Sequence, residues 1–229
     1  MIASIGAAEP AAWREAGAAA FCAAAVGLGE RTRLLTFSVD SHGAGVGPKT
    51  EDYEVMELTG PGSLKAALAE VRHLHLAAFP PLSETTMALL ARAVATARSA
   101  SATLSVGLAR PEQIIEHGRR GVTQELAALR PELLFASEAG GALLTAPLSE
   151  LCEVPVLSIE SGGLRVFDRH VPALHRLNSG GAALTAAFCV AYLEGATPLE
   201  AAGRAVLLGR AAASDGERRA DRALRGGPA

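Results

Sequence analysis

Residues 175–195 read HRLNSGGAALTAAFCVAYLEG, a polar turn with two glycines that runs directly into a helix of small apolar residues. The helical part is apolar nearly all round, so we expect it to be buried on both sides. A turn at a helix N-terminus leaves backbone N–H groups free to hold an anion. Between Asp168 and Glu194, however, the only Asp, Glu, Lys or Arg residues are Arg169 and Arg176. The stretch is therefore either a site without an acid or a simple helix cap.

The rest of the chain alternates strand-like and helix-like segments. Apolar runs predict strands at Ile2–Ile5, Arg33–Val39, Tyr53–Leu58 at a sheet edge, Leu74–Ala78, Thr103–Val106, Leu133–Ala136, Val154–Ile159 and Leu164–Phe167. Helices are predicted at Ala11–Leu28, Leu64–Glu70, Ser83–Arg98, Pro111–Leu129, Glu138–Leu144, 181–193 and 198–213. This order predicts an α/β fold with a mostly parallel central sheet flanked by helices.

Composition and charge argue against a nucleic-acid-binding, membrane-spanning or secreted protein. The 229 residues are 49% hydrophobic and carry a net charge of −3, so nothing indicates a nucleic-acid partner. The longest apolar runs, Ala16–Leu28 and Ala182–Leu193, fall short of the roughly 20 residues that span a bilayer. The three cysteines are isolated and the start shows no secretion signal, which predicts reduced thiols and a cytoplasmic protein. We expect one domain over residues 1–214 and a charged, disordered tail over 215–229.

Polar residues that follow strands should meet at the carboxyl edge of a parallel sheet, where ligands bind. Candidate acids or bases at this edge are Asp40, His42, Glu138 and Glu160. The alternatives are a solvated loop for the first two and salt bridges to arginines for the two glutamates. His73 and His75 face the same side of one predicted strand, but with no third ligand evident the sequence predicts no metal site.

Five segments of the chain resemble the PfkB/ribokinase family of sugar and nucleoside kinases in their order and spacing. They are Gly17–Gly43, Leu133–Glu138, Pro155–Gly163, Val171–Gly195 and Leu199–Ala213. The resemblance implies a ribokinase-like fold, and it is the only indication of ATP and Mg²⁺ as cofactors. Family members insert a β-structured lid after the first strand and another stretch before the central helices. In those places this chain has only Ala7–Ala16 and Asp40–Asp52. We therefore expect the lid to be reduced or absent.

This chain departs from the family most clearly at the catalytic motif. Members close it with Gly-Ala-Gly-Asp, whose glycines hold an anion and whose aspartate takes the proton from the substrate hydroxyl. Here every plausible register places Ala182, Ala183 or Leu184 at the aspartate. The resemblance leaves a remnant of the anion and nucleotide site at Asn178, Ser179, Gly180, Gly181, Ser158 and Gly163.

Two further family motifs are also incomplete. The Asn-x-x-Glu motif falls on Ser137-Glu-Ala-Gly140, so that its last acid becomes a glycine, and Glu160 takes the place of the first nucleotide-binding glycine. Of the substrate pattern Gly-Gly-x-Asn only Gly17 remains. The candidates for a substrate pocket are therefore Gly17, Asp40, His75 and Phe79.

Three functions stay open from the sequence. The first is a pseudokinase that binds a sugar, nucleoside or nucleotide, or a protein partner, including another copy of the chain. The second is an enzyme that uses the pocket at the strand carboxyl ends for another reaction. The third is an active sugar or nucleoside kinase with an unconventional base.

Overall fold

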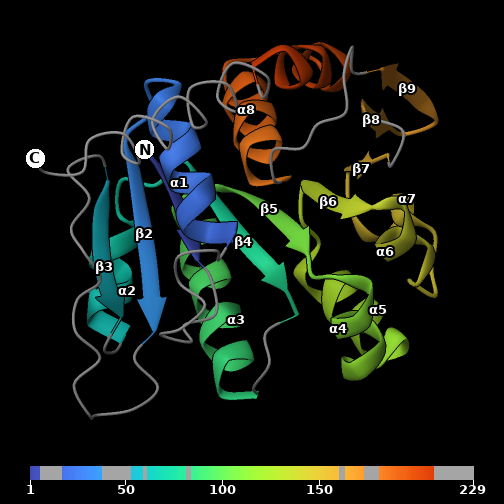
Figure 1. The fold of residues 1–229 in the computed structure, drawn as a ribbon. Coiled ribbons are helices and arrows are strands. Elements are labelled where there is room, and N and C mark those ends of the chain that lie inside the picture. Colours follow the sequence, from blue (N-terminus) through green and yellow to red (C-terminus); the bar gives the residue numbers. More distant parts are fainter. Residues whose placement is uncertain are drawn as a thin grey trace, which may run out of the picture.

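The computed structural model describes residues 1–5, 17–37, 53–58, 61–80, 84–159, 163–172 and 181–208. All nine strands of these residues belong to one sheet, in the order β3-β2-β1-β4-β5-β6-β7-β8-β9 (Figure 1). The strands are β1 (Ile2–Ile5), β2 (Thr32–Phe37), β3 (Glu54–Leu58), β4 (His73–Phe79), β5 (Thr103–Leu108), β6 (Leu133–Ser137), β7 (Val154–Ser158), β8 (Gly163–Val166) and β9 (Arg169–Pro172). Every pairing from β3 to β7 is parallel, and β8 and β9 continue the sheet antiparallel. The predicted fold class is confirmed.

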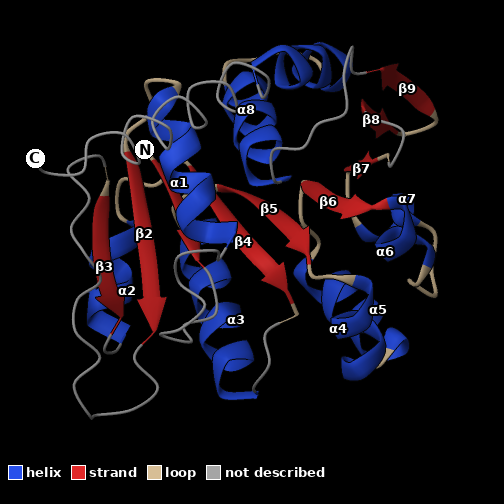
Figure 2. Ribbon diagram, in the orientation of Figure 1, coloured by secondary structure: helices blue, strands red, loops and turns tan. Residues whose placement is uncertain are grey.

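Helices cover both faces of this sheet (Figure 2). They are α1 (Gly17–Gly27), α2 (Pro61–Leu68), α3 (Glu84–Ser99), α4 (Pro111–His117), α5 (Arg119–Leu129), α6 (Glu138–Ala142), α7 (Leu148–Leu151) and α8 (Gly181–Leu193). A further helix covers residues 198–208. Parallel strands need such crossover helices, which return the chain to the same edge of the sheet.

Each face of the sheet has its own hydrophobic core. On one face α2, α3, α4 and α5 pack against aliphatic strand residues such as Ile5, Leu76 and Val106. On the other face α1, α8 and the helix over 198–208 pack around Phe21, Phe188 and their neighbours. Since β1 lies between β2 and β4 and is buried on both faces, all four of its residues are inaccessible to solvent.

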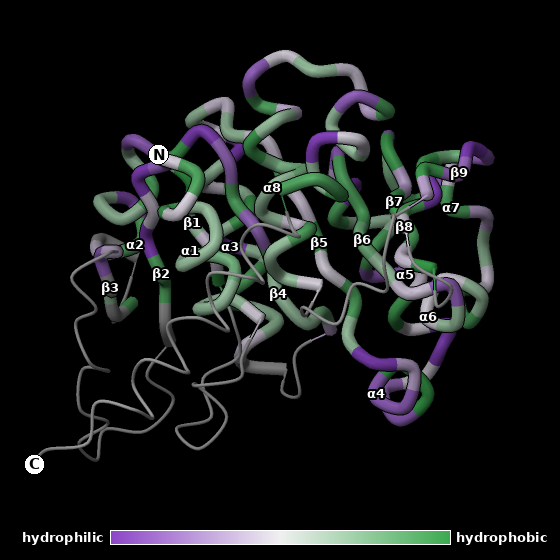
Figure 3. The backbone as a smooth tube through the Cα atoms, turned by 45° about the horizontal axis from the view of Figure 1, so that its top comes forward, coloured by the Kyte–Doolittle hydropathy of each residue, from purple (hydrophilic) through white to green (hydrophobic). Residues whose placement is uncertain are grey.

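Helix α8 is enclosed, as the all-round apolar pattern predicted. Its residues from Leu184 to Ala191 are buried without interruption. The hydropathy of the backbone shows the same contrast, with α8 mostly hydrophobic and α4 largely hydrophilic (Figure 3). The small side chains of α1 and α8 allow these two helices to pack against each other over the sheet.

One prediction about the elements was wrong, and two elements were not predicted. The helix predicted over Pro111–Leu129 is broken into α4 and α5 at Gly118, whose φ of 97° is outside the helical region. The short helix α7 and the strand β9 were not predicted. Short polar elements of this kind carry no hydrophobic period, so their formation depends on the neighbour with which they pair. The tail over 215–229 lies outside the described residues.

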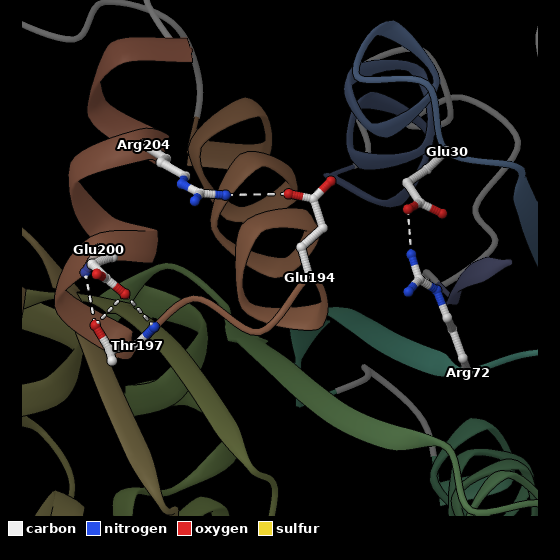
Figure 4. A network of polar contacts seen from close by, with 6 residues as sticks. All are labelled: Glu30, Arg72, Glu194, Thr197, Glu200 and Arg204. Atoms are coloured by element: carbon white, nitrogen blue, oxygen red, sulfur yellow. Dashed lines mark hydrogen bonds and ion pairs between the residues drawn. The ribbon is translucent and has the colours of Figure 1, made fainter.

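Polar contacts fix the ends of elements at the surface (Figure 4). The Thr197 N–H and hydroxyl both donate to Glu200 Oε2, at 2.9 and 2.8 Å, at the start of the helix over 198–208. This reciprocal arrangement is a capping box, and it is followed by Pro198 at the first helical position. Arg204 pairs with Glu194 at 3.2 Å and so ties this helix to the end of α8.

Candidate functional site

The candidate site lies at the carboxyl edge of the parallel strands, where Phe79, Ser137 and Ser158 end β4, β6 and β7. Helices α1 and α8 lie side by side over this part of the sheet and begin at Gly17 and Gly181 (Figure 1). A Cβ at Gly17 would lie 3.7 Å from the Ala77 Cβ, so the start of α1 is placed against the end of β4. The fold therefore brings both helix starts toward the strand ends that the sequence indicated.

The end of β4 is irregular. The pairing of β4 with β5 shifts register between Leu76 and Phe79, and Ala78 within this shift has φ of 54°. A positive φ at a residue with a Cβ is uncommon and strained. The Phe79 side chain itself is only 1% exposed and belongs to the core, so its carbonyl, which accepts from the Ala109 N–H, is the part nearer the edge.

The segment after β6 forms a closed polar turn. The Ser137 hydroxyl accepts a hydrogen bond from the Gly140 N–H at 3.0 Å and caps α6. A Cβ at Gly140 would lie 3.1 Å from this same Ser137 Oγ, closer than most such contacts. Glu138 forms an ion pair with Arg165 of β8, which is the alternative that the sequence left open for it. Both side chains are partly exposed, so the pair contributes about 0–1 kcal/mol to stability.

Ser158 and Gly163 lie on either side of the turn between β7 and β8. Ser158 is exposed, and its hydroxyl donates to the Ala136 carbonyl at 3.4 Å. Gly163 is buried and has φ of 117°, a conformation that only glycine adopts without strain. Its carbonyl accepts from the Ile159 N–H at 3.2 Å, which closes the turn. Among the described residues, nothing lies within 4 Å of a Cβ added at the other predicted remnant, Gly181.

The first turn of α8 carries no acidic or basic side chain. Gly181 is exposed, Ala182 and Ala183 are partly buried, and Leu184 belongs to the core. The Thr185 hydroxyl donates to the Gly181 carbonyl of this turn at 2.8 Å. An acid at position 183 would therefore be partly buried at the helix start, whereas one at 184 would be in the core.

A buried polar network lies beneath α1 and α8. His73 Nε2 and His75 Nδ1 each lie 2.8 Å from Ser105 Oγ, and His73 Nδ1 lies 2.7 Å from Thr103 Oγ1. The Cys189 thiol of α8 donates to the same Ser105 oxygen at 3.7 Å. The sequence predicted that both histidines share one side of a strand, and it placed His75 among the pocket candidates. In the structure the side chain of His75 is only 3% exposed.

Burial controls the charge of this network. It lowers the pKa of both histidines to about 3. The positive charge of Arg72 lowers the pKa of His73 further, and His73 in turn lowers that of His75. Burial also raises the pKa of Cys189 to about 12. The network is therefore neutral near pH 7, and Cys189 is not a reactive thiolate.

Several predicted site residues lie outside the described residues. They are Asp40, His42, Glu160, Asn178, Ser179 and Gly180. Within the described part of the chain, no cluster of three or more His, Cys, Asp or Glu side chains is arranged to hold a metal ion. The described helices also include none whose length and apolar character would allow it to cross a membrane.

Sequence reasoning did not single out Ser105, Thr103 or Arg165. A signal for the first two was present, since Thr103, Ser105 and Gly107 alternate along one strand and so face the side that the histidines occupy. The sequence left open a salt bridge from Glu138 to an arginine, but it did not identify Arg165, because this pair depends on β8 returning antiparallel beside β7.

Comparisons with known proteins bear on the fold. No family model and no curated protein matches the chain. Among solved structures, a putative ribokinase II from E. coli is 14% identical with a TM-score of 0.65, the match covering 91% of each chain. An adenosine kinase from Sinorhizobium meliloti is 13% identical with a TM-score of 0.63, covering 91% of this chain and 83% of that one. The phosphofructokinase-2 from Escherichia coli is 13% identical with a TM-score of 0.62, covering 91% of each chain. The fold of this chain is thus the one shared by ribokinase-like sugar and adenosine kinases.

Proposed function

We propose that this chain is a ribokinase-like protein that binds a small molecule at the carboxyl edge of its sheet but does not transfer phosphate by the kinase mechanism. The observation that carries this proposal is the first turn of α8. It presents Ala182 and Ala183 where the resembling family keeps its catalytic aspartate. No aspartate or glutamate occurs between Asp168 and Glu194, so no shift of register supplies the base.

The turn after β6 supports the same proposal. In the family this turn ends with a glutamate that organises magnesium and phosphate, and here that position is Gly140. A side chain at Gly140 would press on the Ser137 oxygen that caps α6, so the local geometry suits glycine. Glu138, the remaining acid of the turn, is engaged by Arg165. We infer that the described part of the edge provides backbone groups for a ligand rather than a centre for magnesium.

The ligand class follows from the fold neighbours, which are adenosine, ribose-type and fructose-phosphate kinases by name. We propose a sugar, nucleoside or nucleotide as the ligand of this chain. The test is a panel of adenosine, ribose, fructose 6-phosphate and ATP, with and without Mg²⁺, measured by thermal shift and by ATP consumption. A ligand at about 100 times its dissociation constant should stabilise the fold by about 2.7 kcal/mol.

A gain-of-function variant tests the catalytic part of the proposal. Ala183→Asp places a carboxylate at the partly buried start of α8, and Ala183→Asn is the matched control with the same shape and no base. The proposal expects no ATP consumption by the native chain and measurable transfer only in the aspartate variant. Transfer by the native chain with any acceptor of the panel would refute it and establish an active kinase with another base. Ligand turnover without ATP would instead establish an enzyme of another class.

A further inference from the structure

The ring of His75 is fixed in one orientation. It stacks on Phe21 of α1 with ring centroids 4.2 Å apart and an interplanar angle of 15°. Phe135 of β6 meets it edge-on at 6.3 Å and 74°. Nδ1 lies 2.8 Å from Ser105 Oγ, and a ring flipped by 180° would lose this hydrogen bond because it would place Cδ2 there instead. The position of Nε2 is therefore a property of the fold.

The hydrogen bonds of the network determine which nitrogen carries the proton. Ser105 has a single hydroxyl hydrogen but faces His73, His75 and the Cys189 thiol. The Thr103 hydroxyl donates to the Arg72 carbonyl at 3.4 Å, so it accepts from His73 Nδ1–H. His73 Nε2 then accepts the Ser105 proton, and Ser105 Oγ accepts from the thiol and from His75 Nδ1–H. Among the described residues, this arrangement gives every donor of the network an acceptor, and it leaves His75 Nε2 as an unprotonated acceptor.

The Nε2 edge of His75 points along the strands toward the candidate site. A Cβ added to Gly107 would lie 3.4 Å from His75 Cε1 and 3.6 Å from Nε2. Gly107 is the residue before the end of β5 and is partly exposed, whereas Ser105 two residues earlier is fully buried. None of the hydrogen bonds among the described residues involves Nε2. Gly107 has no side chain to stand against this edge of the ring, where Nε2 has no hydrogen-bond partner in the described part of the chain.

We propose that His75 Nε2 accepts a hydrogen bond from a hydroxyl group of the small molecule that binds at the carboxyl edge of the sheet. This assignment rests on the proposed function and adds the chemistry of the ligand. A neutral imidazole acceptor favours a ligand with a hydroxyl donor, such as the ribose ring of a nucleoside, and rejects its deoxy analogue. Removing the hydroxyl would leave a buried acceptor unpaired, which should weaken binding about tenfold to a hundredfold.

Nitrogen NMR of the full chain tests the assignment directly. In the free protein near neutral pH, the ¹⁵N spectrum of labelled histidine should show His75 protonated at Nδ1 and unprotonated at Nε2. Titration with adenosine or ribose should then shift the Nε2 resonance of His75 and leave that of His73 in place. Protonated Nε2 in the free protein, or a bound ligand that leaves the His75 resonances unmoved, would overturn the assignment.

The variant Gly107→Ala tests access without altering the network. Its methyl group would stand in ordinary contact with the ring, so the fold should tolerate it while the ligand loses its approach to Nε2. Affinity for the ligand of the panel should fall at least about tenfold. Gly121→Ala, on α5 with open space around it, is the matched control and should bind normally. Unchanged binding by Gly107→Ala would reject the assignment while keeping the proposed function. A wild-type chain that binds no compound of the panel would reject both.

Discussion

Lowering the pH from about 7.5 to about 5 should destabilise the folded chain through His73 and His75. Both side chains are buried, with 0% and 3% exposure, and burial holds both neutral by lowering their pKa. The ordinary histidine pKa of 6.5 falls to about 3 in the fold. Between about pH 6.5 and about pH 3 the histidines of the unfolded chain are protonated, whereas those of the folded chain stay neutral. Stability from the pair is fully present above pH 6.5 and is lost as the pH falls toward 3.

The size of the loss follows from the two pKa values. At about pH 5 the unfolded chain gains about 2 kcal/mol from protonating each histidine, while the folded chain gains almost nothing. The two together should lower the free energy of unfolding by about 4 kcal/mol relative to about pH 7.5. The groups facing the pair do not offset this loss, because Thr103, Ser105 and Cys189 are uncharged and Arg72 disfavours protonation of His73.

Urea unfolding followed by far-UV circular dichroism at both pH values measures the difference. His73→Gln removes one of the two titrating groups and should reduce the difference to about 2 kcal/mol. His170→Gln is the control, because His170 is exposed on β9 and should leave the difference unchanged. A wild-type difference below about 1 kcal/mol, or an equal difference in His73→Gln, would contradict the reasoning.

Three further predictions concern the fold, and each is checked by chemical unfolding at neutral pH. Gly118→Ala should lower the free energy of unfolding by at least about 1 kcal/mol, because φ of 97° is strained for alanine. Gly121→Ala, inside α5, should raise it by about 0.5–1 kcal/mol, and a change of the same sign in both variants would argue against a helix break at Gly118. Phe188→Ala should cost about 3–5 kcal/mol because the ring is 0% exposed, while Phe167→Ala at 47% exposure should change stability by less than about 0.5 kcal/mol. Thr197→Ala should cost about 1 kcal/mol by removing the capping box, and no change would mean that the cap is replaced by water.

Strong hydrophobic patterns made most of the fold predictable. The apolar runs at Leu74–Ala78 and Leu133–Ala136 and the apolar helix over 181–193 appear within a residue or two of their predicted ends. The α/β class followed because strands and helices alternate in order. The break at Gly118 was missed, because a glycine within a helical pattern does not by itself tell a tolerated residue from a turn. Strand β9 was missed because its residues Arg169–Pro172 become a strand only by pairing with β8.

The candidate site was predictable in part. That Ala182, Ala183 or Leu184 replaces an aspartate is visible in the sequence, as is the absence of any acid between Asp168 and Glu194. The identity of Arg165 as the partner of Glu138 was not predictable, because that pair depends on β8 returning antiparallel beside β7. The Ser137 cap of α6 is a local contact, since its hydroxyl accepts from the N–H of Gly140, three residues further on.

The sequence by itself therefore determined the order of elements, the enclosed character of α8 and the missing acid at its start, because these depend on residue type and local period. Only the tertiary structure decided that His73 and His75 share one serine, that they are neutral, and that His75 Nε2 points past Gly107 toward the strand ends. The physical reason is that burial and hydrogen-bond partners come from β5 and α8, which are distant in sequence and adjacent only after the sheet has formed.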